Sequence, residues 1–103
     1  MAKLSIYWTL TAIKQRNYIF AYWNERNKNN TYSKKLNIAI KERISILIDN
    51  PRLGKPTQHG EVRGISLGHY SIFYKIQGTH IYITALWDNR QKPQKLIKVL
   101  RKQ

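Results

Sequence analysis

The sequence contains no cysteine. This absence excludes disulfide bonds and thiolate zinc sites within the chain, and it is typical of proteins from a reducing cytoplasm. Acidic residues are also scarce: 5 Asp and Glu stand against 19 Lys and Arg, so the formal net charge is +14. Because a field of that sign raises the encounter rate with polyanions, we expect an anionic partner, either a nucleic acid or an acidic protein.

Long hydrophobic runs are missing as well. No stretch approaches the ~18 apolar residues of a membrane span, and residues 1–10 alternate instead of forming the continuous apolar segment of a signal peptide. We therefore expect a soluble, intracellular, cytoplasmic protein. With 103 residues, of which 42% are hydrophobic and 12% aromatic, the chain is predicted to fold as one domain spanning residues 1–103.

The spacing of apolar residues predicts a strand followed by two helices. Residues 4–8 alternate between apolar and other side chains, which is typical of a strand with one buried face. Helical spacing follows over residues 12–27 and again over residues 32–49. Pro51 ends the second helix, because the residue before a proline is pushed out of the α region. A short polar turn joins the helices, so we expect an antiparallel helix hairpin.

A loop over residues 50–61 then leads to three predicted strands, at residues 62–67, 70–77 and 81–87. Their glycine-containing turns are tight, which favours antiparallel pairing.

Strict alternation would place Ile81, Ile83, Ala85 and Trp87 on one face of the last of these strands. Pro93 can open a short C-terminal helix over residues 94–101. The resulting order is β-α-α-β-β-β. It predicts an α+β fold of two layers, in which the helix hairpin packs on a mainly antiparallel sheet and a short C-terminal helix follows.

Three features of this order carry a resemblance to a known family. Trp8 closes the first strand, the loop reads NPRLGKP at residues 50–56, and WDNRQKP follows the last strand at residues 87–93. With its length and charge, the chain resembles the RelE/ParE superfamily of bacterial toxins, also described as plasmid stabilization proteins. The resemblance implies the toxin of a type II toxin–antitoxin system. It also implies a heteromeric complex with a cognate acidic antitoxin, whose C-terminal segment folds on the toxin surface.

The superfamily divides by target, and its ribosome-dependent ribonucleases need a catalytic set. A 2′-hydroxyl must lose a proton, the phosphorane needs positive charge and the leaving oxygen needs an acid. Here Ser71 stands where these nucleases place a third-strand Arg, and no Tyr or His follows Arg90. The endoribonuclease hypothesis therefore rests on an incomplete set: Arg63, His69, Tyr70 and Arg90.

The other branch comprises ParE-like toxins that inhibit DNA gyrase, and the resemblance implies no catalytic set for it. The sequence fits this branch better by default. The candidates for contact with the target or the antitoxin are Arg63, Trp23, Arg90, Lys92, Lys95 and Lys98. Structural roles are assigned to Asp88, as an acceptor of backbone hydrogen bonds, and to Pro93. A third alternative is a small basic nucleic-acid-binding domain without a toxin role.

Some of these residues could instead have a purely structural role. Arg63 could form an ion pair with Asp88 or Glu61. Tyr70, Tyr74 and Tyr82 could stack on bases, although aromatic residues are favoured in strands without such a role. Trp8 and Trp87 are predicted core residues. The three histidines lack metal-ligand spacing, so we expect neither a metal nor another cofactor.

Overall fold

The structure is a computed structural model that describes residues 4–92, 94–95 and 98. Two helices and five strands lie within this part of the chain. In chain order they are β1 Ser5–Trp8, α1 Leu10–Asn27, α2 Thr31–Asp49, β2 Lys55–Pro56, β3 Arg63–Leu67, β4 Tyr70–Gln77 and β5 His80–Asp88.

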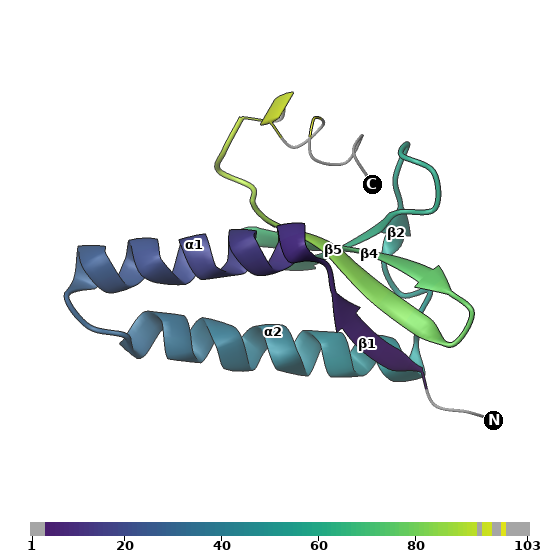
Figure 1. The fold of residues 1–103 in the computed structure, drawn as a ribbon, viewed down its shortest axis with the longest axis horizontal. Helices are drawn as coiled ribbons and strands as arrows, with labels where there is room; N and C mark the ends of the chain where they lie inside the picture. The colour runs from purple at the N-terminus through teal and green to yellow at the C-terminus, as the bar shows by residue number, and fades with distance from the viewer. Residues whose placement is uncertain (1–3, 93, 96–97, 99–103) are drawn as a thin grey trace.

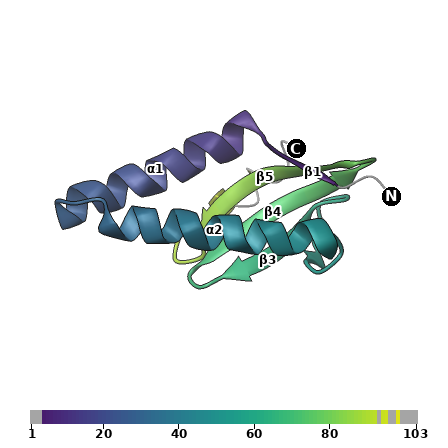
Figure 2. The same cartoon turned by 90° about the horizontal axis from the view of Figure 1, so that it is seen from below.

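The strands form one mixed sheet in the order β1-β5-β4-β3-β2. β1 pairs with β5 in parallel, and every other pairing is antiparallel. The two helices run antiparallel across one face, and their connecting turn projects beyond the sheet (Figures 1 and 2). The predicted α+β order and the mainly antiparallel sheet are therefore confirmed, with one further strand, β2, in the segment predicted as a loop.

Local signals explain where the helices begin and end. The Thr9 hydroxyl oxygen accepts a hydrogen bond from the Ala12 backbone N–H at 3.2 Å, which satisfies one of the donors left free at the start of α1. α1 is followed by Lys28, whose φ of 57° is left-handed and reverses the chain.

No helix among the described residues is long and apolar enough to cross a membrane.

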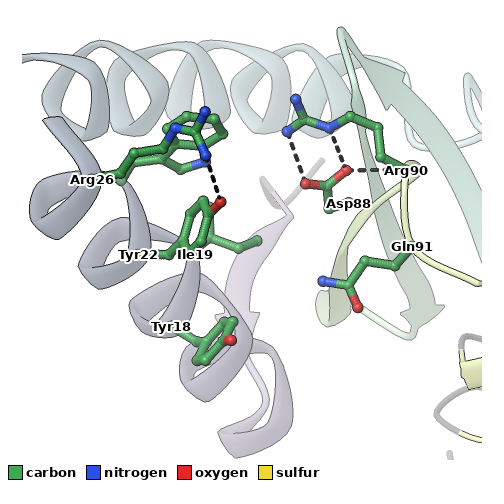
Figure 3. Close-up of a pocket in the computed structure, with 8 residues that line it drawn as sticks. Tyr18, Ile19, Tyr22, Arg26, Asp88, Arg90 and Gln91 are labelled. Atoms are coloured by element: carbon green, nitrogen blue, oxygen red, sulfur yellow. Dashed lines mark hydrogen bonds and ion pairs between the residues drawn. The ribbon is translucent and has the colours of Figure 1, made fainter.

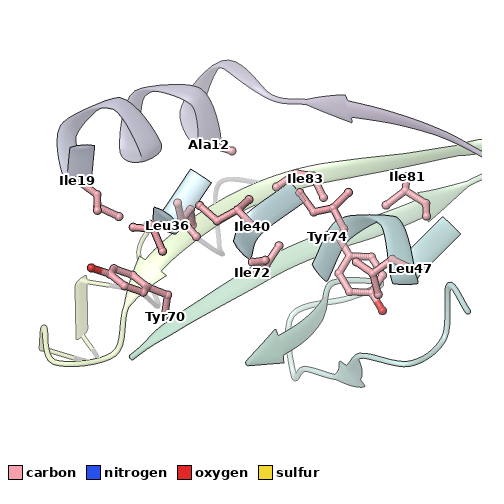
Figure 4. Packing of buried hydrophobic residues seen from close by; sticks show 12 residues of the cluster. Ala12, Ile19, Leu36, Ile40, Leu47, Tyr70, Ile72, Tyr74, Ile81 and Ile83 are labelled. Atoms are coloured by element: carbon pink, nitrogen blue, oxygen red, sulfur yellow. The ribbon is translucent and has the colours of Figure 1, made fainter. Parts of the chain in front are cut away.

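A hydrophobic core fills the space between the helices and the sheet (Figure 4). α2 contributes Leu36, Ile40, Ile44 and Leu47, and the spacing of these residues brings them onto one helix face. A second, smaller cluster lies on the opposite face of the sheet. Its members are Val62, Phe73, Ala85 and Trp87.

β5 contains a bulge that the sequence pattern does not reveal. Phe73 pairs with Ala85, whereas the next residue, Tyr74, pairs with Ile83. Thr84 is thus the extra residue of the bulge on β5. Such a residue interrupts the alternation of side chains between the two faces.

The prediction that Ile81, Ile83, Ala85 and Trp87 lie on one face of β5 was therefore wrong. Ile81 and Ile83 pack in the core beneath the helices, but Ala85 and Trp87 lie in the smaller cluster on the other face. Leu86 takes the next position in the helix-side core. Both faces of β5 are therefore buried near its end, as its apolar sequence requires.

The segment after α2 is held to the sheet by the side chain of Tyr74, which is fully buried. Its hydroxyl donates to the Pro51 carbonyl oxygen and accepts from the Gly54 N–H, both at 2.8 Å. A Cβ atom on Gly54 would lie 2.5 Å from this hydroxyl oxygen, so only glycine fits without displacing it.

Most of the predicted helix over residues 94–101, and Pro93, lie outside the described residues.

Candidate functional site

A pocket of about 430 Å³ lies between α1 and the end of β5 (Figure 3). On α1, Tyr18, Tyr22 and Arg26 follow one another at intervals of four residues, so they share a helix face. Residues at and after the end of β5 form the opposite wall. The full lining is Tyr18, Ile19, Tyr22, Trp23, Arg26, Asp88, Arg90 and Gln91.

The hydroxyl of Tyr70 connects the helices to this end of the sheet. Trp23 Nε1 donates a hydrogen bond to it at 3.1 Å, and Arg90 Nη2 donates at 3.5 Å. The hydroxyl of Tyr32 lies 3.2 Å away. Since two nitrogen donors already point at the Tyr70 oxygen, its own proton is directed toward Tyr32.

This environment keeps Tyr70 neutral. Only 2% of the residue is exposed, and burial raises the pKa of Tyr70 from 10.0 to about 12. The hydrogen bond to Tyr32 contributes to this rise in the pKa, because it requires the protonated hydroxyl. At neutral pH Tyr70 is thus a fixed hydroxyl and a poor general base.

Asp88 and Arg90 form a bidentate ion pair at the rim of the pocket (Figure 3). Arg90 Nε donates to Asp88 Oδ1 at 2.9 Å and Arg90 Nη2 donates to Asp88 Oδ2 at 2.8 Å. The backbone N–H of Arg90 also donates to Oδ1 at 2.9 Å. These hydrogen bonds lower the pKa of Asp88 and raise the pKa of Arg90.

Two guanidinium groups lie over the indole ring of Trp23. Those of Arg26 and Arg90 are each 5.6 Å from its centroid, within the range of cation–π attraction. Tyr22 meets the indole edge-on with centroids 5.1 Å apart, and Tyr32 lies at 4.9 Å. The site therefore offers a rigid aromatic wall beneath a cationic rim, an arrangement suited to binding an acidic peptide with apolar side chains.

Comparisons with known proteins identify the family. A family model described as "ParE toxin of type II toxin-antitoxin system, parDE" matches residues 6–93. The chain belongs to the ParE toxin family. The resemblance drawn from the sequence is thereby confirmed in its ParE branch, and membership speaks against a basic domain without a toxin role.

A solved structure supports the fold of this ParE-family chain. A chain from the "Chromosomal ParDE TA system from P. aeruginosa" is 22% identical with a TM-score of 0.70, and the similarity covers 82% of this chain and 94% of that one. At this identity the likeness concerns the fold alone. No curated protein matches the sequence.

The fold of this ParE-family chain brings together only part of the residue set expected from the sequence. Trp23, Tyr70 and Arg90 meet at the pocket, although they lie on α1, on β4 and beyond β5. Arg63 does not join them. Its Nη1 donates to the carbonyl oxygen of Gly54 at 2.7 Å and of Arg52 at 3.3 Å, so its guanidinium holds the segment before β2.

The remaining predicted residues lie on the surface. His69 is exposed in the turn between β3 and β4, and its carbonyl oxygen accepts the N–H of Asn89. Lys92, Lys95 and Lys98 are exposed in the segment that follows the pocket. The described residues contain no cluster of His, Asp and Glu that could hold a metal ion.

Several residues of the pocket were not predicted from the sequence. Tyr18, Tyr22 and Arg26 could have been found, since their four-residue spacing predicts an aromatic and basic stripe on the exposed side of the first helix. Tyr32 carried no comparable signal. Its hydroxyl reaches Tyr70 only because the two helices cross the sheet at this point.

Proposed function

We propose that this ParE-family toxin inhibits DNA gyrase and that a cognate antitoxin neutralises it in a toxin–antitoxin complex. The observation that carries the proposal is the family match, which extends over residues 6–93. The description of that family names a paired system, and a net charge of +14 suits an acidic partner.

The antitoxin is proposed to occupy the pocket between α1 and the end of β5. Ile19, Trp23 and Tyr18 supply apolar surface there, and Arg26 and Arg90 supply positive charge. An acidic segment that folds on binding would bury its apolar residues against this wall, and its carboxylates would meet the rim. Lys92, Lys95 and Lys98 extend the cationic surface and are proposed to contact the target.

A supercoiling assay tests the target. Purified toxin is added to DNA gyrase with relaxed plasmid and ATP, and we expect supercoiled product to decrease as toxin increases. Toxin preincubated with an equal amount of the antitoxin encoded beside it should leave the reaction unchanged, which controls for impurities. Full supercoiling in a large molar excess of active toxin would contradict the gyrase assignment.

Binding measurements test the pocket. The dissociation constant of the antitoxin is measured by titration calorimetry for the unchanged toxin, for Arg26→Gln and for Lys41→Gln. Both substitutions remove one positive charge, but Lys41 lies on α2 and does not line the pocket. We expect about tenfold weaker binding for Arg26→Gln and little change for Lys41→Gln. If both substitutions weaken antitoxin binding equally, the affinity depends on the net charge of the toxin and not on the pocket.

A ribosome-dependent endoribonuclease is the alternative function. One observation favours it, namely the position of the Arg90 guanidinium 3.5 Å from the Tyr70 hydroxyl at the rim of a pocket. Against it stand the raised pKa of Tyr70 and the engagement of Arg90 by Asp88. Ser71, in the position of the nuclease arginine, donates to Asn89 Oδ1 at 2.9 Å.

Mapping of messenger RNA ends after induction distinguishes this alternative. In the nuclease interpretation, ribosome-dependent cuts appear and Arg90→Ala abolishes them while the fold is retained. Cleavage that survives this substitution would remove Arg90 from the catalytic set, and the absence of any cleavage would remove the alternative.

A further inference from the structure

Three aromatic rings stand together on the face of the sheet that the helices leave uncovered. Tyr7 of β1 stacks on His80 of β5, with ring centroids 4.7 Å apart and planes 10° from parallel. Tyr82 of β5 lies 5.8 Å from each of them, at interplanar angles of 30° and 25°. The planes of Tyr7 and His80 are thus close to parallel, the ring of Tyr82 is tilted beside them, and the three rings rise from two neighbouring strands.

Strand pairing places these rings side by side. β1 and β5 run in parallel with Tyr7 opposite Tyr82, and Ser5 is opposite His80. The alternate residues of the same strands, such as Ile6 and Ile81, pack under the helices. The ring-bearing positions consequently point to the other face. Tyr7 is 47% exposed there, so its ring is accessible to a ligand.

A cationic side chain lies beside this aromatic platform, which consists of Tyr7, His80 and Tyr82. Lys75 lies directly opposite Tyr82 in the pairing of β4 with β5, so both project from the same face. β1 and β4 contain no acidic residue. The acid of β5, Asp88, is at the far end of that strand and belongs to the pocket on the helix side.

We infer that the aromatic platform binds single-stranded nucleic acid by stacking unpaired bases against its rings, while Lys75 meets the phosphate backbone. Grouped rings of this kind offer π faces on which an unpaired base can stack, and every base has such a face. A net charge of +14 supplies the long-range attraction for a polyanion. The site is separate from the antitoxin pocket, so the inference does not depend on the proposed function.

Single strands fit the platform better than a duplex does. In a duplex the bases are already stacked on one another, and only the phosphates are available to a flat surface. Charge alone would attract both forms. A preference for unpaired bases that depends on the rings therefore distinguishes stacking from general electrostatic binding.

Fluorescence anisotropy tests the inference with the purified toxin and three labelled probes: a 12-nucleotide oligo(dT), a 12-nucleotide oligo(rU) and a duplex of the same length. Tyr7→Leu removes the ring but keeps an apolar side chain on the strand, and Tyr7→Phe keeps the ring. Ile38→Ala is the control, because it shortens an exposed apolar side chain on α2, away from the platform and from the antitoxin pocket.

We expect Tyr7→Leu to weaken binding of at least one single strand about tenfold and to leave duplex binding unchanged. Tyr7→Phe and Ile38→Ala should bind like the unchanged protein, and thermal melting confirms that all variants are folded. A stronger effect on oligo(dT) or on oligo(rU) shows which of the two strands the rings bind better, and either result supports the inference.

Three outcomes would overturn it. If Tyr7→Leu binds all probes as before, or weakens single strands and duplex equally, the rings contribute nothing beyond charge and the cross-strand pair is structural. If Tyr7→Leu instead weakens only the complex with the antitoxin, the platform is a protein interface. Should Tyr7→Leu fail to fold, Tyr82→Leu removes another ring of the platform and provides the same comparison.

Discussion

Trp23 Nε1 donates a hydrogen bond to the hydroxyl of Tyr70 at 3.1 Å and so joins α1 to the first residue of β4. Arg90 reaches the same hydroxyl from beyond β5 and also lies over the indole ring. Three segments that are distant in the chain thus share one small network. Because each member holds another in place, the wall of the pocket is rigid before any partner arrives.

The first prediction concerns the coupling of Trp23 and Tyr70. Trp23→Phe removes the indole donor and Tyr70→Phe removes its acceptor, so each should lower the free energy of unfolding by about 1–3 kcal/mol. The double variant should lose about 1 kcal/mol less than the sum, since the shared hydrogen bond is lost only once. Urea unfolding measures all four proteins. Strictly additive losses would mean that the bond contributes nothing to stability.

A second prediction follows from the raised pKa of Tyr70. Its pKa of about 12 in the folded protein exceeds the ordinary value of 10.0, so its contribution to stability is complete below pH ~10 and is lost as the pH rises toward 12. We expect the stability difference between the unchanged protein and Tyr70→Phe to shrink over this range. Denaturant unfolding at several alkaline pH values measures it. A difference that stays constant would contradict the buried, neutral hydroxyl.

A third prediction concerns the stability of the fold at acidic pH. The hydrogen bonds from Arg90 lower the pKa of Asp88, so this carboxylate stabilises the fold above the unfolded pKa of about 4, and the contribution is lost as the pH falls through the lower folded value. Asp88→Asn should therefore cost about 1 kcal/mol at pH 7 and progressively less below pH ~4. Urea unfolding across this range provides the measurement.

Glu25→Gln is the control for the acid prediction. Glu25 pairs with Lys28, but both side chains are largely exposed, with 81% and 77% of their surface accessible. Such a pair contributes little, and its loss should change stability by less than about 0.5 kcal/mol at any pH. If the two substitutions behave alike, the pair of Asp88 and Arg90 is no stronger than an ordinary surface contact.

The fourth prediction concerns the close approach of Gly54 to Tyr74. In Gly54→Ala the new methyl group would lie 2.5 Å from the Tyr74 hydroxyl oxygen and 3.0 Å from the Gly64 carbonyl oxygen. The resulting displacement should destabilise the protein by about 2–3 kcal/mol, seen as a lower melting temperature. Gly60→Ala is the comparison, because no atom lies within 4 Å of its Cβ position and only its left-handed φ of 63° is penalised, at about 1 kcal/mol.

Much of the fold was predictable because its signals are local. Apolar spacing predicted both helices to within two residues at each end, and alternation predicted the strands that became β1, β3, β4 and β5. The bulge at Thr84 was not predictable, since any residue type can occupy such a position and only pairing with β4 reveals it. β2 was missed because two residues are too short for a periodic pattern.

For the candidate site, the sequence by itself determined the excess of positive charge, the aromatic and basic content and, through WDNRQKP at residues 87–93, the family resemblance. Only the tertiary structure decided which of these residues meet. It joined Trp23 and Arg90 to Tyr70, turned Arg63 toward backbone carbonyls, and set Tyr7 against His80. The physical reason is that composition and period depend on neighbours in the chain, whereas these contacts depend on strand register and helix crossing.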